Sequence, residues 1–256
     1  MSPQSEAPHR PLTGRRALIT GASAGIGAAV AAAFHAAGAE VLLLARRKER
    51  LEALVAALPG ARAIEADVRD PAALARAAEG QRVDLLLANA GLARGVAPIH
   101  ESSPEEWAEM FETNVFGVLG AVRACLPWML EQGRGDVVLL GSVAGRAVYP
   151  GGSVYCASKH AVAALYQALR EDAGGRGVRF TTVDPGMVET EFSQVRFRGD
   201  ESRAAAVYRG FQPLTPADIA RTILFAVTQP PHVNIGEIVM WPSAQISVTR
   251  VNRQSC

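Results

Sequence analysis

Short apolar runs recur along the chain and alternate with longer segments that carry a helical period. The runs occupy residues 17–19, 41–44, 85–87, 137–140, 180–183 and 235–240. Because each run is apolar at successive positions, both faces of the predicted strands are expected to be covered, as in a parallel sheet. The helical segments span residues 26–37, 48–58, 71–78, 104–131, 153–171 and 216–228. This alternation predicts an α/β fold, a doubly wound parallel sheet of the Rossmann-like kind with helices on both faces.

Three of the predicted helices begin with the same signal, a polar residue followed by proline. The pairs are Asp70 with Pro71, Ser103 with Pro104, and Thr215 with Pro216. A polar side chain can cap the free N–H groups of a first helical turn, and proline fits the first helical position. We therefore expect each of these helices to start at its proline.

Residues 187–213 interrupt the alternation with aromatic and charged residues that follow no clear period. A long irregular insertion after a strand often covers an active site, so we interpret this stretch as a lid, and a surface loop with one short helix is the alternative. We call residues 187–213 the lid segment. No linker divides residues 15–242, which we expect to form one domain. Residues 1–14 are polar and proline-rich and predict a disordered arm, and residues 243–256 form a C-terminal tail.

Composition excludes several classes of function. The chain has 256 residues and a formal net charge of +1, which gives no general basic field for nucleic acid or anionic lipid. No run of about 18 apolar residues predicts a membrane span. The three cysteines lack a paired spacing, and the five histidines lack a metal-binding spacing, so neither a disulfide framework nor a metal site is expected. We expect a cytoplasmic protein.

A glycine-rich turn follows the first predicted strand and opens directly into a helix. It contains Gly21, Ser23, Ala24, Gly25, Ile26 and Gly27. Gly21 permits a tight turn, Gly25 allows the backbone to approach a pyrophosphate, and Gly27 allows close packing of helix on strand. With an anion at the helix N-terminus, this turn predicts a dinucleotide site.

Two arginines end the second predicted strand, where an acidic residue would favour NAD. The guanidinium groups of Arg46 and Arg47 suit the 2′-phosphate of NADP, which they can hold through charge-assisted hydrogen bonds. The alternative is that they and Arg50 only solvate the start of a helix. We predict NADP as the cofactor.

Further candidate residues stand at the ends of other predicted strands. They are Asp67 and Val68, then Asn89, Ala90 and Gly91, then Pro185 and Gly186. Asp67 can accept from the adenine amino group, and the backbone at 89–91 can run close to the adenosine ribose. Each could be an ordinary turn, but their shared position at carboxyl ends of strands favours the cofactor interpretation.

Tyr155 and Lys159 are four residues apart, which places them on one face of a helix, and Ser142 precedes them. A phenol has a pKa near ~10, so Tyr155 exchanges protons at neutral pH only when a positive charge stabilises its phenolate. Lys159 is placed to supply that charge.

In combination, these motifs resemble those of the short-chain dehydrogenase/reductases over about residues 15–241. The resemblance implies that Tyr155 exchanges the substrate proton while Ser142 positions the substrate oxygen. It implies that Lys159 holds the nicotinamide ribose and lowers the pKa of Tyr155, and that Asn114 anchors a water leading to solvent. It also places Val188 and Thr190 beside the cofactor. One departure is Ala88, where the family usually has asparagine, which affects local stability more than activity.

Residues 46–47, 190–200, 214–216 and 232–235 are similar to those of NADP-dependent serine and 3-hydroxy acid dehydrogenases. We therefore expect an oxidoreductase for a small polar alcohol or carbonyl, such as a 3-hydroxy acid or amino alcohol, with Arg196 or Arg198 as candidates to meet a carboxylate. A reductase for an aldehyde or ketone on a specialised metabolite is a second interpretation. A non-catalytic dinucleotide-binding scaffold or redox sensor is a third. The resemblance further implies a homotetramer assembled through the helices near residues 114–131 and 153–173.

Overall fold

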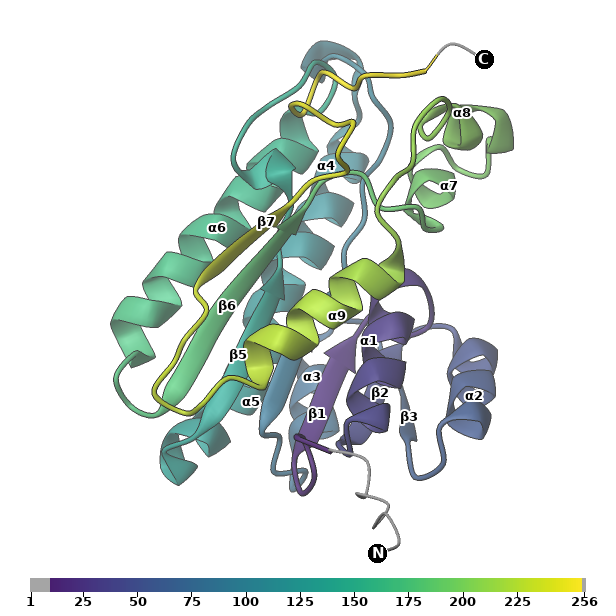
Figure 1. The fold of residues 1–256 in the computed structure, drawn as a ribbon. Helices are drawn as coiled ribbons and strands as arrows, with labels where there is room; N and C mark the ends of the chain where they lie inside the picture. The colour runs from purple at the N-terminus through teal and green to yellow at the C-terminus, as the bar shows by residue number, and fades with distance from the viewer. Residues whose placement is uncertain (1–9, 255–256) are drawn as a thin grey trace, which may run out of the picture.

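The apolar runs become the central strands of one parallel sheet. A computed structural model describes residues 10–254, which form seven parallel strands in the order β3-β2-β1-β4-β5-β6-β7 (Figure 1). The strands are β1 Arg16–Thr20, β2 Glu40–Ala45, β3 Arg62–Glu65, β4 Leu85–Ala88, β5 Gly135–Leu140, β6 Val178–Pro185 and β7 Glu237–Met240. The helices are α1 Gly25–Ala36, α2 Lys48–Ala57, α3 Pro71–Ala78, α4 Pro104–Phe111, α5 Gly117–Gln132, α6 Ser153–Ala173, α7 Phe192–Arg196, α8 Glu201–Ala206 and α9 Pro216–Val227. The predicted doubly wound fold is confirmed.

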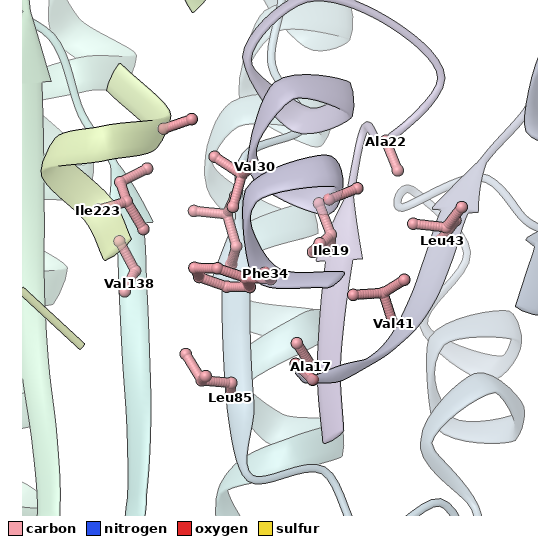
Figure 2. Packing of buried hydrophobic residues seen from close by; sticks show 14 of the residues in the cluster. Ala17, Ile19, Ala22, Val30, Phe34, Val41, Leu43, Leu85, Val138 and Ile223 are labelled. Atoms are coloured by element: carbon pink, nitrogen blue, oxygen red, sulfur yellow. The ribbon is translucent and has the colours of Figure 1, made fainter. Parts of the chain in front are cut away.

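Two apolar layers hold helices against the sheet. On one face, Val30 and Phe34 of α1 and Ile223 of α9 pack against strand residues that include Val138 (Figure 2). On the other face, side chains of α3, α5 and α6 form a second buried cluster. Because both faces of the strands are covered, the strands read as continuous apolar runs in the sequence.

The order of the strands reverses between β1 and β4. From β1 the chain proceeds outward through β2 to β3, and it then returns to place β4 on the other side of β1. In open α/β sheets, ligands bind at the carboxyl ends of strands where the order reverses. The fold therefore directs attention to the loops after β1 and β4.

The sequence-based prediction missed β3. This strand has four residues, and its place at the edge of the sheet leaves Arg62, Ala63 and Glu65 exposed. A strand so short and so polar gives no apolar run, because only one of its faces meets the protein interior.

The predicted helix starts are confirmed. The side chains of Asp70, Ser103 and Thr215 each accept a hydrogen bond from a backbone N–H in the first turn of α3, α4 and α9. Thr215 forms a full capping box with Asp218, in which each residue's side chain bonds the other's backbone.

The predicted helix over residues 104–131 is interrupted. Between α4 and α5 the chain forms a π-helical turn at Glu112–Phe116, which contains Asn114. The whole stretch Pro104–Gln132 is long and apolar enough to cross a membrane by length and composition. Here its buried side packs on the sheet through residues such as Val118 and Val122, as a core helix does.

The lid segment is more regular than predicted, because it contains the short helices α7 and α8. In Figure 1 both helices lie at the same end of the molecule as the C-terminus of the chain, away from α1 and α2. The tail returns to this segment: Gln245 Oε1 accepts from the N–H of Met187 at 2.8 Å, and the N–H of Gln254 donates to Gly210 O at 2.7 Å.

The expected disordered arm is wrong for its last residues. Residues 1–9 lie outside the described part of the chain, but residues 11–14 are folded into turns. Leu12 is fully buried in the cluster beside α1, and its N–H donates to Ala37 O at 2.9 Å. A single leucine among polar residues gave no periodic signal for this contact.

Candidate active site

A cavity of about 600 Å³ lies at the carboxyl ends of the strands, where the strand order reverses. Its walls come from the loops after β1 to β6, from α6 and from the lid segment. Almost all of the predicted site residues line it: Gly21, Ser23, Ala24, Gly25, Ile26, Arg46, Arg47, Asp67, Val68, Asn89, Ala90, Gly91, Ser142, Tyr155, Lys159, Pro185, Gly186, Val188 and Thr190. Gly27 and Asn114 stand behind the wall.

The glycine-rich turn after β1 is shaped for close approach of a ligand. Gly21 and Gly25 have φ angles of +66° and +54°, which side-chain-bearing residues rarely adopt. A Cβ on Gly27 would lie 2.5 Å from Gly21 O, so α1 can start this close to β1 only with glycine there. α1 begins without a side-chain cap, which leaves its first N–H groups for an anion.

Arg47 lies beside this turn and is not simply solvated. Its Nε donates to Ser23 Oγ at 3.1 Å, and its Nη1 lies 2.8 Å from Glu191 Oε2 of the lid segment. Arg46 is more exposed and lies 3.9 Å from Asp67. The uncapped helix start, the glycine cradle and these cationic donors form a donor set that fits a dinucleotide with a 2′-phosphate.

Asn89 fixes the glycine-rich turn from the neighbouring strand. Its Nδ2 donates to Thr20 O at 2.8 Å and to Gly21 O at 3.3 Å, and its backbone N–H donates to Thr20 Oγ1 at 3.0 Å. The side chain of Asn89 therefore joins the ends of β1 and β4, which helps to explain how the sheet accommodates Ala88 where the family usually has asparagine.

Tyr155 and Lys159 project from α6 toward the cavity, and Ser142 reaches it from the end of β5. Lys159 is buried, and its Nζ donates to Leu140 O at 2.8 Å and lies 6.0 Å from the centre of the Tyr155 ring. Ser142 Oγ accepts from the N–H of Ala144 at 3.1 Å, so its hydroxyl proton can be donated to the Tyr155 oxygen.

Burial is the largest influence on the pKa values of Tyr155 and Lys159. Burial raises the pKa of Tyr155 above its ordinary value, and the opposing effects of a hydrogen bond with Ser142 and the charge of Arg196 are smaller. Burial also lowers the pKa of Lys159 to about 8, although the charge of Asp184 opposes this. Lys159 is hydrogen-bonded to Leu140 O, and the activation of Tyr155 by its charge stays a prediction.

Asn114 is buried in the π-helical turn, and its side chain forms hydrogen bonds with other residues of the protein. Oδ1 accepts from the N–H of Leu92 at 2.8 Å, while Nδ2 donates to Leu92 O at 2.8 Å and to Ser158 Oγ at 3.0 Å. These contacts join the loop after β4 to α6 close to Lys159. A water held by Asn114 stays a prediction.

The sequence did not identify several residues that line the cavity. Tyr149, Glu191, Tyr208 and Gln245 are among them, and all come from irregular segments that carry no motif. Of the two lid arginines that were candidates to meet a carboxylate, Arg196 lines the cavity, whereas Arg198 points to Glu106 with 2.7 Å between Nη2 and Oε1. Over residues 10–254, no three histidine, cysteine or acidic residues gather to hold a metal ion.

Residues 15–201 match the short chain dehydrogenase family, and the chain belongs to that family. This confirms the resemblance drawn from the glycine-rich turn and from the tyrosine and lysine on one helix.

Relatives align over nearly their whole length. An uncharacterized oxidoreductase of Mycobacterium tuberculosis is 46% identical over 237 residues, covering 92% of this chain and 94% of the relative. An NADP-dependent 3-hydroxy acid dehydrogenase of Salmonella typhi is 42% identical over 89% of this chain and 95% of its own. An NADP-dependent 3-hydroxy acid dehydrogenase of Schizosaccharomyces pombe is 39% identical over 95% of this chain and 98% of its own. The solved closed form of a serine dehydrogenase complexed with NADP+ superposes with a TM-score of 0.89 at 39% identity, covering 93% of this chain and 100% of that one.

Proposed function

We propose that this protein is an NADP-dependent oxidoreductase that interconverts the hydroxyl group of a small 3-hydroxy acid and the corresponding carbonyl. The observation that carries the proposal is the convergence of Ser142, Tyr155 and Lys159 on the same cavity as the glycine-rich turn and Arg47. Relatives named NADP-dependent 3-hydroxy acid dehydrogenases support both the cofactor and the substrate class.

In the oxidation direction, the Tyr155 phenolate accepts the proton of the substrate hydroxyl, and Ser142 donates a hydrogen bond that orients that oxygen. NADP+, when bound, supplies the acceptor for the hydride that leaves the carbinol carbon. Lys159 lies at the inner end of the cavity, where its ammonium group can hold a ribose hydroxyl. Reduction uses the same residues in reverse, with Tyr155 as the proton donor.

The proposal also covers the cellular compartment and the oligomeric state of the protein. We infer a cytoplasmic homotetramer built through the helices near residues 114–131 and 153–173. Phe116 and Leu119 of that region are exposed apolar side chains that such an interface would cover. Amino alcohols, the other small polar alcohols expected from the sequence, are candidate substrates beside 3-hydroxy acids.

An absorbance assay at 340 nm with NADP+ or NADPH and a panel of 3-hydroxy acids, amino alcohols and aldehydes tests the proposal. We expect oxidation of 3-hydroxy acids to accelerate with rising pH as Tyr155 loses its proton, and reduction to slow. Tyr155→Phe should abolish turnover while the Kd of NADPH changes little. Retention of a tenth of the parent kcat in Tyr155→Phe would show that another group exchanges the proton.

A further inference from the structure

Arg196 ends α7 and enters the cavity at the side where Tyr155 lies. Its Nε donates to Gly95 O at 2.8 Å, and its backbone carbonyl accepts from the N–H of Gly95 at 3.0 Å. Arg94 adds a hydrogen bond from Nη1 to Val195 O at 2.7 Å. These bonds join the lid segment to the loop after β4 and fix the direction of the Arg196 guanidinium.

One end of this guanidinium has no partner. Arg196 Nη2 is buried and makes no hydrogen bond, a state that within residues 10–254 it shares only with Trp128 Nε1. A buried cationic donor left unpaired is costly, because it loses its hydration without compensation. The neighbouring arginines are matched: Arg94 pairs with Glu109, and Arg198 pairs with Glu106. Among the described residues, no carboxylate forms an ion pair with Arg196.

Aromatic rings, and no carboxylate of the described chain, surround Arg196, and the Tyr149 hydroxyl is hydrogen-bonded with its guanidinium. Its Cζ lies 5.4 Å from the ring centre of Tyr149 and 5.9 Å from those of Tyr155 and Phe197. Ring faces attract a cation but carry no negative charge, so no ion pair within residues 10–254 neutralises the positive charge of Arg196. Low polarity around the guanidinium strengthens its attraction to an anion that enters.

We propose that Arg196 is the residue that selects the substrate by binding its carboxylate with the part of the guanidinium that lines the cavity. In a 3-hydroxy acid, one methylene separates the carboxyl carbon from the carbinol carbon. The carboxylate can therefore lie against Arg196 while the hydroxyl faces Tyr155, whose ring the guanidinium flanks. This inference rests on the proposed function for the identity of the reacting alcohol. It adds the group that distinguishes an acid from an uncharged alcohol of the same shape.

A matched pair of substrates and variants tests the assignment. The substrates are 3-hydroxybutyrate and 3-hydroxybutyramide, which share a carbon skeleton and differ in charge. The variants are Arg196→Met and, as control, Arg198→Met, which removes an arginine two residues away that does not line the cavity. We expect Arg196→Met to reduce the ratio of kcat/KM for the acid to that for the amide at least tenfold. Arg198→Met should leave this ratio within twofold of the parent value.

The ratio separates recognition from a structural role. If Arg196 only held the lid segment in place or only influenced Tyr155, both substrates would lose activity together and the ratio would not change, which would overturn the proposal. Arg196→Lys retains a positive charge and covers the case in which the methionine variant does not fold. We expect it to keep part of the preference for the acid, and an acid-to-amide ratio at or above the parent value would also overturn the proposal.

A binding measurement keeps the test independent of turnover. Protein saturated with NADPH cannot oxidise 3-hydroxybutyrate, so calorimetric titration reports binding alone. We expect the parent to bind the acid more tightly than the amide and Arg196→Met to lose that preference. Absence of turnover with any 3-hydroxy acid would contradict the proposed function. Equal preference in parent and Arg196→Met would contradict the role of Arg196.

Discussion

Glu191 of the lid segment forms an ion pair with Arg47 beside the glycine-rich turn, with 2.8 Å between Oε2 and Nη1. Arg50 binds the other oxygen of the same carboxylate. The hydrogen bonds from Arg50 and Arg47 hold the pKa of Glu191 below its ordinary value, so the carboxylate is charged at neutral pH. The guanidinium that we assign to the 2′-phosphate of NADP is therefore paired with an anion of the protein itself.

Replacing Glu191 should reveal this competition. Because both partners of the Arg47 pair are partly exposed, the pair contributes no more than about 1 kcal/mol. We expect Glu191→Gln to tighten NADPH binding about two- to fivefold and to leave NADH binding unchanged, measured by nicotinamide fluorescence.

Glu189→Gln is the matched control for Glu191. Glu189 lies exposed in the same segment and takes part in no ion pair of the described chain. The variant Glu189→Gln should leave the Kd values of NADPH and NADH unchanged. Weaker NADPH binding in Glu191→Gln would mean that the carboxylate orients the arginines for the phosphate rather than competing with it.

The two arginines at the end of β2 should set the preference for NADP over NAD. We expect the double variant Arg46→Gln/Arg47→Gln to weaken NADPH binding by about 1.5 kcal/mol for each arginine replaced, near the lower limit for charge-assisted hydrogen bonds because both side chains are partly exposed. NADH binding should change far less. Of the single variants, Arg47→Gln should have the larger effect, because Ser23 already orients Arg47 toward the turn. Equal losses for NADPH and NADH would show that the arginines only solvate α2.

The motifs that could be predicted from the sequence are those that lie on or beside helices and strands. Gly21, Gly25 and Gly27 occupy fixed places between β1 and α1, and Tyr155 and Lys159 keep the spacing of α6. Such spacing is set by local backbone geometry, so it can be predicted without knowing what lies across the molecule.

Residues that act through long-range contacts escaped prediction. Gln245 reaches Met187 from the far end of the chain, and Glu191 reaches Arg47 across 144 positions. The distinction between Arg196 and Arg198 could not be predicted either, because it depends on how the last turn of α7 directs each side chain. The raised pKa of Tyr155 depends on the surrounding burial, which spacing does not reveal.

A buried charge cluster at the other end of the sheet should contribute much more to stability than an exposed pair. Asp136 at the start of β5 is 4% exposed and pairs with both Arg15 and Arg179. Asp136→Asn leaves two arginines without their shared anion and should reduce the free energy of unfolding by about 3 kcal/mol. The control Glu40→Gln breaks the exposed pair with Arg16 and should cost less than about 1 kcal/mol. Urea unfolding of both variants decides the matter, and similar losses would contradict the assigned difference in burial.

Lys159 should make the stability of the unliganded protein depend on pH in a predictable direction. Burial lowers its pKa from 10.5 to about 8, so the folded state holds this proton less firmly than the unfolded chain does. The cost of burying the charged amine is fully present below about pH 8 and is relieved as the pH rises toward 10.5. At about 1.36 kcal/mol for each pKa unit, the whole difference corresponds to about 3 kcal/mol.

Lys159→Met removes this titration and nearly preserves the shape of the side chain. The methionine leaves Leu140 O without its hydrogen bond at every pH, so that loss shifts the stability of the variant by a constant amount. We therefore compare the free energy of urea unfolding of the two proteins at pH 7 and pH 10 without cofactor. The advantage of the parent over the variant should grow by about 2–3 kcal/mol between these pH values, because only the parent is relieved of a buried charge. A difference that stays constant would show that Lys159 keeps its ordinary pKa in the folded protein, and that its ammonium group remains charged beside Tyr155 throughout the working range.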